Sequence, residues 1–453
     1  MINKKVITRF APSPTGHFHV GGIRSALYNF LFARQNNGTY ILRSEDTDKE
    51  RSKIEYENEF LELFDWLGLK HDLFFRQSDR LEIHQKYLKK MMDEGYAYLS
   101  KEIPTEEGQR DEVIRFKNPN KKITFTDLIL GDITVDTTDL GDFVIARDMN
   151  EPLYHLTVVI DDFEMGVTHV IRGQEHTSNT SRQILIQEAI RATRPLYAHL
   201  PLILNKERVK LSKRDESVPS AIEYKKRGYI PEALLNFMAL NGWNPGGEQE
   251  IFTLSELIEK FDISQIQKGG GVFNPEKLEW VNKEHMKHLS EDVRNKEIID
   301  RFQNNPGINQ NIKIKDEKFL LKLCPVIFDH ISKWGDIDTM IGVGELDYYF
   351  NAPQYETNLL YWKANPTPEE TKKHLEFILD TLKNTPEDNF SNSEKIKSLI
   401  FDYATKNGRG QVLWPLRVAL SGKDKSPDPF TLIYIMGKTE TISRIDEAIK
   451  KLS

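Results

Sequence analysis

The first apolar positions of the chain form a short continuous run and then recur at helical spacing. Residues 6–11 predict a buried strand, and apolar side chains at three- and four-residue intervals from Val20 to Arg34 predict a helix. The intervening residues 12–22 include prolines, glycines, small hydroxyl residues and histidines. Prolines stiffen a turn, glycines let a ligand approach the backbone, and the N-terminus of a helix attracts anions. The pattern therefore favours a phosphate-binding joint, with His19 as a hydrogen-bond donor.

This joint does not match the common nucleotide-binding motifs. It lacks the Lys-Ser/Thr ending of a P-loop, and the spacing of Gly16, Gly21 and Gly22 differs from the dinucleotide fingerprint. A strand, a glycine-containing turn and a helix also occur in many α/β proteins that bind nothing at the turn. A nucleotide site of another type is needed to explain the segment as a functional one.

Strand and helix patterns alternate through the first half of the chain. Strands are predicted at residues 39–43, 156–160 and 167–171, and helices at residues 54–67, 79–93 and 181–191. Such alternation predicts a parallel sheet that binds ligands at the carboxyl edge of its strands. From about residue 291 to the end, the pattern is helical throughout.

Length and composition fit a soluble protein of two or more domains. The chain has 453 residues, of which 39% are hydrophobic and 29% charged, and its net charge is -7. That charge argues against a polybasic nucleic-acid protein, although a local basic face can still bind RNA. We see no secretory segment and no apolar run of membrane length. We therefore expect a cytoplasmic protein that does not contact a membrane.

A second candidate motif lies about two hundred residues downstream. The sequence Lys210-Leu211-Ser212-Lys213-Arg214 stands in a locally basic stretch, and a solvated charged loop is its ordinary interpretation. Together, however, the His19-Val20-Gly21-Gly22 turn and this loop resemble the two signatures of class I aminoacyl-tRNA synthetases. The two motifs together identify this class of enzyme far more specifically than either motif alone.

Four further segments narrow the resemblance to glutamyl-tRNA synthetases. These segments are residues 9–16, 42–48, 167–176 and 410–422. The resemblance implies an α/β Rossmann-type class I catalytic domain with an inserted acceptor-binding domain, followed by all-α domains that contact the tRNA stem and the anticodon. The implied boundaries are 1–72 and 150–218 for the catalytic domain, 73–149 for a shortened insertion, 219–290 for the stem-contact domain and 291–453 for the anticodon-binding domain.

The resemblance also implies the reaction. The enzyme would activate L-glutamate with ATP, forming glutamyl-adenylate and pyrophosphate, and then transfer glutamate to the 3'-terminal adenosine of tRNA-Glu, with tRNA-Gln left open as a second acceptor. The substrate carboxylate and the ATP phosphates repel each other, so the site must supply positive charge and alignment. The implied catalytic residues are His19, Lys210 and Lys213. The implied ATP-binding residues are His19, Gly21, Gly22, Gly173, Glu175 and Lys213, and Mg²⁺ should accompany the ATP.

Glutamate recognition requires a cation for the side-chain carboxylate, and an arginine fork suits it well. By motif match, the glutamate-binding positions are Arg9, Ser13, Glu45, Tyr154 and Arg172. Glu45 would take the α-ammonium group, and the two arginines would take carboxylates. Buried arginine and glutamate residues also often pair only to stabilise a sheet edge, which is the alternative for each.

Other residues have weaker assignments. Arg409 and Arg417 are chemically suited to bind anticodon bases, whereas Trp414 is expected to be structural. The pair Asp161-Asp162, placed after a predicted strand, could serve the ribose or the tRNA terminus, or could cap a helix.

We expect neither zinc nor another protein-held metal. Some members of the family bind zinc in a longer insertion, but this chain has a short segment there and a single cysteine, Cys324. We also expect the protein to act as a monomer.

Two alternatives remain from other readings of the motifs. A glutaminyl-tRNA synthetase would carry β-barrels in its anticodon module, whereas the last 150 or so residues here are predicted to be helical. A non-catalytic tRNA-binding paralogue would have no need to keep His19, Lys210 and Lys213.

The basic loop gives a direct test of the catalytic interpretation. Lys213→Ala should reduce turnover most strongly, because the lysine would stabilise charge on the triphosphate, while glutamate binding should stay nearly intact. ATP-pyrophosphate exchange with glutamate and tRNA-Glu present measures both quantities. A variant with wild-type turnover would remove Lys213 from this role.

Overall fold

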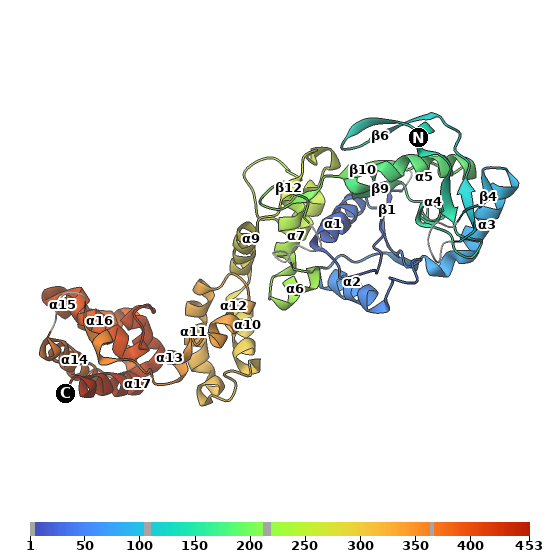
Figure 1. The fold of residues 1–453 in the computed structure, drawn as a ribbon. Helices are drawn as coiled ribbons and strands as arrows, with labels where there is room; N and C mark the ends of the chain where they lie inside the picture. Colours follow the sequence, from blue (N-terminus) through green and yellow to red (C-terminus); the bar gives the residue numbers. More distant parts are fainter. Residues whose placement is uncertain (1–4, 104–109, 212–218, 363–366) are drawn as a thin grey trace. The chain divides into compact units, whose positions relative to one another are not determined.

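The computed structural model describes residues 5–103, 110–211, 219–362 and 367–453. The chain divides into two compact units, Met1–His285 and Met286–Ser453, called the first and second units below (Figure 1). Ser212, Lys213 and Arg214 of the predicted basic loop lie outside the described residues. Among the residues that are described, no helix is long and apolar enough to cross a membrane.

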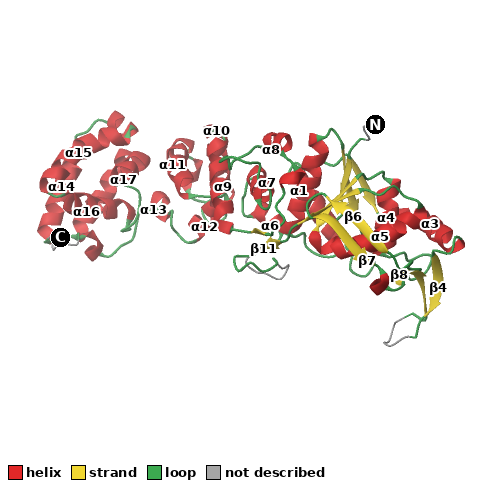
Figure 2. Cartoon of the chain, turned by 90° about the horizontal axis from the view of Figure 1, so that it is seen from above, coloured by secondary structure: helices red, strands yellow, loops and turns green. Residues whose placement is uncertain are grey.

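A seven-stranded sheet forms the centre of the first unit (Figure 2). Its strands are β1 (Ile7–Phe10), β2 (Thr39–Ser44), β3 (Leu73–Arg76), β6 (Lys122–Asp127), β7 (Gly131–Asp136), β9 (His169–Gly173) and β10 (Leu196–Leu200). Their order is β3-β2-β1-β9-β10-β6-β7, and only β7 runs antiparallel to its neighbour. Strand order reverses direction at β1, which lies between β2 and β9. Such a reversal creates a crevice at the carboxyl ends of the two central strands.

Helices pack against this sheet. They are α1 (Val20–Gln35), α2 (Ile54–Trp66), α3 (Leu81–Asp93), α4 (Tyr154–Glu164) and α5 (Thr177–Ile190). Helix α1 follows β1 as predicted and buries Ile23 and Leu27 completely. The chain turns from α1 into β2 at Gly38, where a Cβ atom would lie 2.4 Å from the carbonyl oxygen of Val6. Glycine is therefore needed for the close approach of this turn to the chain that enters β1.

The segment 73–149 contributes to two different sheets. Strands β4 (Ala97–Lys101), β5 (Glu112–Phe116) and β8 (Phe143–Ala146) form a separate antiparallel sheet. Strands β3, β6 and β7 of the same segment belong to the seven-stranded sheet. The segment is thus built partly into the seven-stranded sheet and partly into the separate one.

The strand predicted at residues 156–160 was wrong, because these residues lie inside helix α4. Every residue from Leu156 to Asp162 is buried in this helix, so apolar side chains occur on nearly all of its faces. A short continuous apolar run cannot distinguish a buried strand from a buried helix. Asp161 and Asp162 consequently lie within α4 and are not caps at its start.

The remaining elements of the first unit follow β10. They are β11 (Ile203–Leu204), α6 (Ala221–Lys226), α7 (Pro231–Leu240), α8 (Leu254–Lys260), β12 (Gly271–Val272) and α9 (Pro275–His288), which extends past the boundary between the units. Strands β11 and β12 pair in parallel.

The second unit is helical, as the sequence predicts. Its helices are α10 (Glu291–Asn304), α11 (Glu317–His330), α12 (Gly335–Gly342), α13 (Asp347–Phe350), α14 (Pro368–Lys383), α15 (Ser393–Asn407), α16 (Arg409–Ser421) and α17 (Pro429–Lys451). No strand occurs in the described part of this unit. Helices α14, α15, α16 and α17 pack together around fully buried side chains such as Ile378, Leu416 and Ile445.

Candidate active site

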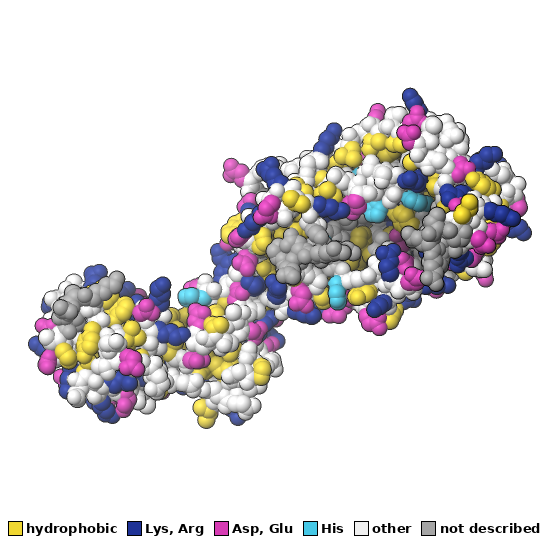
Figure 3. Space-filling model, viewed as in Figure 1, with side chains coloured by type: hydrophobic (Ala, Val, Ile, Leu, Met, Phe, Trp, Pro, Cys, Tyr) yellow, Lys and Arg dark blue, Asp and Glu magenta, His cyan; other side chains and the backbone are white. Residues whose placement is uncertain are grey.

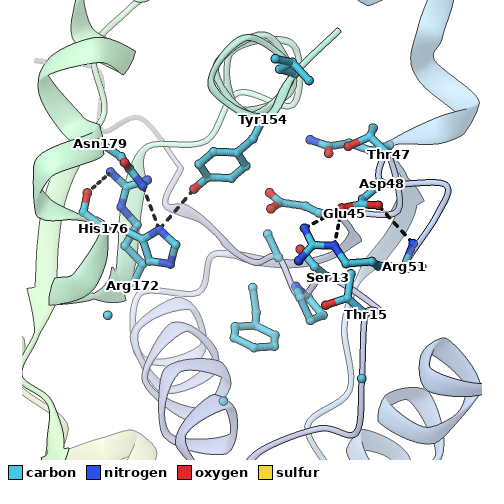
Figure 4. A pocket seen from close by; sticks show the side chains of 18 of the residues that line it. Ser13, Thr15, Glu45, Thr47, Asp48, Arg51, Tyr154, Arg172, His176 and Asn179 are labelled. Carbon is cyan, nitrogen blue, oxygen red and sulfur yellow. Dashed lines mark hydrogen bonds and ion pairs between the residues drawn. The ribbon is translucent and has the colours of Figure 1, made fainter. Parts of the chain in front are cut away.

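A pocket of about 1140 Å³ opens at the carboxyl ends of β1, β2 and β9. Parts of four segments line it, residues 9–25, 45–51, 147–154 and 171–179, together with Gln77. Figure 4 shows Arg172 and Tyr154 on one side of the pocket, with Ser13 and Glu45 on the other. The pocket thus occupies the place that the reversal of strand order predicts for a ligand.

His19 ends the loop after β1 and caps α1. Its Nδ1 atom accepts a hydrogen bond from the backbone N–H of Gly21 at 3.1 Å. Because Nδ1 is the acceptor, the proton of the neutral ring resides on Nε2, which makes that atom a donor. Gly22 has a packing role beside its predicted one, since a Cβ atom there would lie 2.4 Å from the ring of Phe18.

A buried charge network connects β1, β2 and α4 beside the pocket. The carboxylate of Asp162 accepts from Arg43 Nη1 at 2.7 Å and from Arg9 Nε at 3.1 Å. Arg43 also pairs with Glu45, whose Oε1 lies 3.2 Å from Nη2. The side chain of Arg43 is 0% exposed, so both carboxylates are needed to stabilise its charge.

The two carboxyl groups of this network differ in their pKa. Burial would raise the pKa of Asp162, but the charges of Arg9 and Arg43 lower it below its ordinary value. Burial raises the pKa of Glu45 despite the opposing effect of Arg43. The contrast follows from contacts, because Asp162 touches two guanidinium groups and Glu45 touches one.

Arg172, at the end of β9, has no carboxylate partner within the described part of the chain. Its Nη2 donates to Thr180 Oγ1 at 2.7 Å, and its Nε donates to His199 Nε2 at 3.3 Å. Across the described residues, no Asp or Glu forms an ion pair with it, although its side chain is only 7% exposed. Burial lowers the pKa of the guanidinium from its usual value. A buried cation that faces a pocket without a protein counter-ion is suited to bind an anion there.

Tyr154 and His176 complete this side of the pocket. The hydroxyl of Tyr154 lies 3.5 Å from His176 Nδ1, and the side-chain amide of Asn179 lies 3.3 Å from the same atom. Burial, followed by the charge of Arg172, lowers the pKa of His176 to about 4. A neutral His176 adds no second positive charge beside Arg172.

Comparisons with known proteins agree with this geometry. Residues 5–112 and 101–280 match the family model described as the catalytic domain of class I tRNA synthetases (E and Q), and residues 276–449 match an anticodon binding domain. The chain is 38% identical to the glutamate–tRNA ligase of Aquifex aeolicus over 99% of this chain and 100% of that protein. It is 37% identical to the glutamate–tRNA ligase of Carboxydothermus hydrogenoformans over 97% and 99%.

A solved structure extends the similarity to the whole fold. The crystal structure of a glutamate tRNA ligase from Elizabethkingia meningosepticum, in complex with its amino acid, matches with a TM-score of 0.87 and 31% identity, over 99% of this chain and 100% of that one. The chain belongs to the glutamate–tRNA ligase family. The helical second unit of this ligase also disfavours the glutaminyl alternative, which predicted β-barrels.

The ligase brings together most of the residues that the sequence singled out. The pocket is lined by Arg9, Ser13, His19, Gly21, Gly22, Glu45, Tyr154, Arg172, Gly173 and Glu175. Lys210 is not one of the described lining residues; it is exposed, and its backbone pairs with Leu204. The assignments of these residues to glutamate or ATP remain predictions.

Sequence reasoning missed Arg43 and the role of Asp162. A charged residue directly after the apolar run Tyr40-Ile41-Leu42 was the available signal for Arg43. The cap interpretation of the acidic pair was wrong, because both residues lie inside α4, and a contact with the ribose or the tRNA terminus stays a prediction. Asp161 is fully buried and accepts from Arg80, His84 and Gln77, so it forms a second buried cluster next to the one around Asp162.

Two candidate anticodon residues lie on α16 of the second unit. The guanidinium of Arg409 lies 4.5 Å from the ring centre of Phe401, and the Nε atom of Arg417 is buried without a partner among the described residues. Trp414 donates to the carbonyl of Leu359 at 2.8 Å, which supports a structural role. Basic and acidic side chains are interspersed on the visible face of each unit (Figure 3).

The charge network predicts a stability effect of Asp162→Asn. The change leaves Arg43 buried with one carboxylate partner, so we expect a loss of about 3 kcal/mol in the free energy of unfolding of the first unit. Hydrogen–deuterium exchange of β1 and β2 peptides, with thermal unfolding, measures it. Asp139→Asn is the matched control, because Asp139 is exposed and forms no ion pair with any described residue. Equal protection in both variants would contradict the account.

Proposed function

We propose that the pocket of the first unit binds L-glutamate and ATP, forms glutamyl-adenylate, and then transfers glutamate to the 3'-terminal adenosine of tRNA-Glu. The observation that carries this proposal is the buried Arg172, which faces the pocket without a carboxylate partner among the described residues. A substrate carboxylate would supply the missing counter-ion. Membership of the glutamate–tRNA ligase family supports the same substrate.

Glutamate has three charged groups, and the pocket offers partners for two of them, the side-chain carboxylate and the α-ammonium group. The proposed partner of the side-chain carboxylate is Arg172, with Arg9 as the second arginine. Arg9 uses Nε for Asp162, and its Nη atoms form no hydrogen bond with any described residue. Glu45 is the proposed partner of the α-ammonium group. Ser13 and Tyr154 would add hydrogen bonds, and this arrangement leaves the α-carboxylate free to react.

The reaction itself needs charge stabilisation and no covalent bond to the protein. An oxygen of the α-carboxylate attacks the α-phosphorus of ATP, and pyrophosphate leaves. A ribose hydroxyl of the tRNA terminus then attacks the activated carbonyl carbon, and AMP leaves. His19 Nε2–H and the N-terminus of α1 are suited to the phosphates, and Lys210 and Lys213 are the further proposed cations.

The remaining ATP contacts are proposed from the pocket lining. Gly21 and Gly22 would lie beside the phosphates, and Gly173 and Glu175 beside the adenosine. Within the described residues, no group of three or more His, Cys, Asp or Glu side chains could hold a metal ion. Mg²⁺ is therefore proposed to arrive with ATP, held mainly by phosphate oxygens and water.

The tRNA contacts are proposed to follow the order of the chain. Residues 73–149 would contact the acceptor end, residues 219–290 the stem, and residues 291–453 the anticodon, with Arg409 and Arg417 as contacts to bases. A monomer is the proposed working form. The cytoplasm is the proposed location.

Charging of purified tRNA tests the proposed function. The full chain should attach glutamate to tRNA-Glu when ATP and Mg²⁺ are present, and glutamine should not replace glutamate. Aminoacylation of tRNA-Glu and tRNA-Gln, measured side by side with labelled amino acids, also reveals the acceptor range. No charging of either tRNA with glutamate would overturn the proposal.

Arg172 substitutions test glutamate recognition separately. Arg172→Ala should raise the glutamate KM about 10- to 100-fold, because charge-assisted hydrogen bonds are lost, and should change the ATP KM little. Arg172→Lys should fall between this variant and wild type, because lysine keeps the charge but lacks the fork. Arg194→Ala, an exposed change outside the pocket lining and outside the proposed tRNA-contacting segments, is the control. Steady-state ATP-pyrophosphate exchange gives both KM values, and an unchanged glutamate KM in Arg172→Ala would refute the contact.

A further inference from the structure

Three buried residues on neighbouring strands form a chain of contacts that ends at Arg172. Asp127 stands at the end of β6, His199 on β10 and Arg172 on β9. His199 and Arg172 are register partners across the two parallel strands. His199 Nδ1 lies 2.7 Å from Asp127 Oδ2, and His199 Nε2 lies 3.3 Å from Arg172 Nε. Asp127 and His199 are 2% and 0% exposed, so water does not substitute for these contacts.

The hydrogen-bond partners determine where the His199 proton resides. Asp127 accepts from the backbone N–H groups of His199, Ile129 and Leu130, so it acts as an ionised acceptor. The Nδ1 atom of His199 must then be the donor in the 2.7 Å contact. Its Nε2 atom is left as an acceptor, facing the Nε–H of Arg172. Burial lowers the pKa of His199, which agrees with a neutral ring.

Thr180 supports the same guanidinium from a second direction. Its hydroxyl oxygen accepts from Arg172 Nη2 at 2.7 Å and lies 3.1 Å from His199 Nε2. Arg172 is therefore oriented by two uncharged side-chain acceptors, and its Nη2 also donates to the carbonyl oxygen of His176 at 3.4 Å. A carboxylate in either place would neutralise the guanidinium and compete with a substrate anion. Arg43 shows that contrasting case, since it pairs with two carboxylates and is 0% exposed.

We propose that His199, held by Asp127, is a positioning residue that directs Arg172 into the pocket while leaving its charge available for the glutamate side-chain carboxylate. This inference rests on the proposed function of Arg172. Asp127 is the last residue of β6, within the segment 73–149. Through its contact with His199 in the seven-stranded sheet, this segment would contribute to amino-acid specificity. His199 acts only through Arg172 and does not touch the substrate.

Two amide substitutions of His199 distinguish its contact with Asp127 from its contact with Arg172. In His199→Asn the amide N–H can still donate to Asp127, but the side chain is too short to place an acceptor where Nε2 faces Arg172, whereas in His199→Gln the carbonyl oxygen can reach Arg172. His199→Asn should raise the glutamate KM about tenfold, and His199→Gln should stay within about threefold of wild type. The ATP KM should remain within about twofold in both. The assay is ATP-pyrophosphate exchange by the full chain with tRNA-Glu present.

The inference would be overturned if His199→Asn and His199→Gln had equal glutamate KM values, because a general structural defect does not distinguish the two variants. A parallel rise of the ATP KM would also overturn it. If His199→Asn does not fold, Thr180→Val and Thr180→Ser provide a second pair, in which only Val should raise the glutamate KM. Arg172→Ala is measured in the same assay. An effect of Arg172→Ala without an effect of His199→Asn would refute only the positioning role, whereas no effect of Arg172→Ala would refute the proposed function itself.

Discussion

The carboxylate of Asp162 is the interaction on which the rest of the site depends. It accepts from Arg9 and Arg43 at the carboxyl edge of the sheet, and Arg43 in turn holds Glu45. Two arginines and two carboxylates balance within this network, which offsets much of the desolvation cost of burying them. Helix α4 is therefore fixed to β1 and β2 by charge as well as by apolar packing. Arg172 stands outside this balance, because no carboxylate among the described residues forms an ion pair with it, and we propose that its charge makes the pocket selective for an anion.

Sheet topology explains why distant segments meet at this pocket. The reversal of strand order at β1 places the loops after β1, β2 and β9 side by side, although more than a hundred residues separate β2 from β9. One loop, residues 9–22, borders the pocket together with both Glu45 and Arg172. Contacts for the amino acid and for the nucleotide can therefore be set by a single rigid turn. Strand β6 of the segment 73–149 pairs with β10, and β10 pairs with β9, which carries Arg172. The segment therefore also supports the position of Arg172.

The sequence predicted several of the local elements and many of the residues that line the pocket, but not the partners of the charged residues. Hydrophobic periodicity identified β1 and α1, because β1 lies in a continuous apolar run and α1 buries apolar residues at helical spacing. The same reasoning failed at residues 156–160, where a helix is buried on nearly all sides. Arg9, Glu45 and Arg172 were found through motif resemblance. Arg43 and His199 were not, because their partners lie 119 and 72 residues away in the chain and no spacing rule connects them.

The central claim is that the guanidinium of Arg172, which forms no ion pair with any described carboxylate, receives the side-chain carboxylate of glutamate. A crystal structure of the full chain with bound L-glutamate tests this claim most directly. The account predicts the side-chain carboxylate within hydrogen-bond distance of Arg172 and the α-ammonium group beside Glu45. A glutamate whose side-chain carboxylate lies away from Arg172, or whose ammonium group contacts neither oxygen of Glu45, would contradict it.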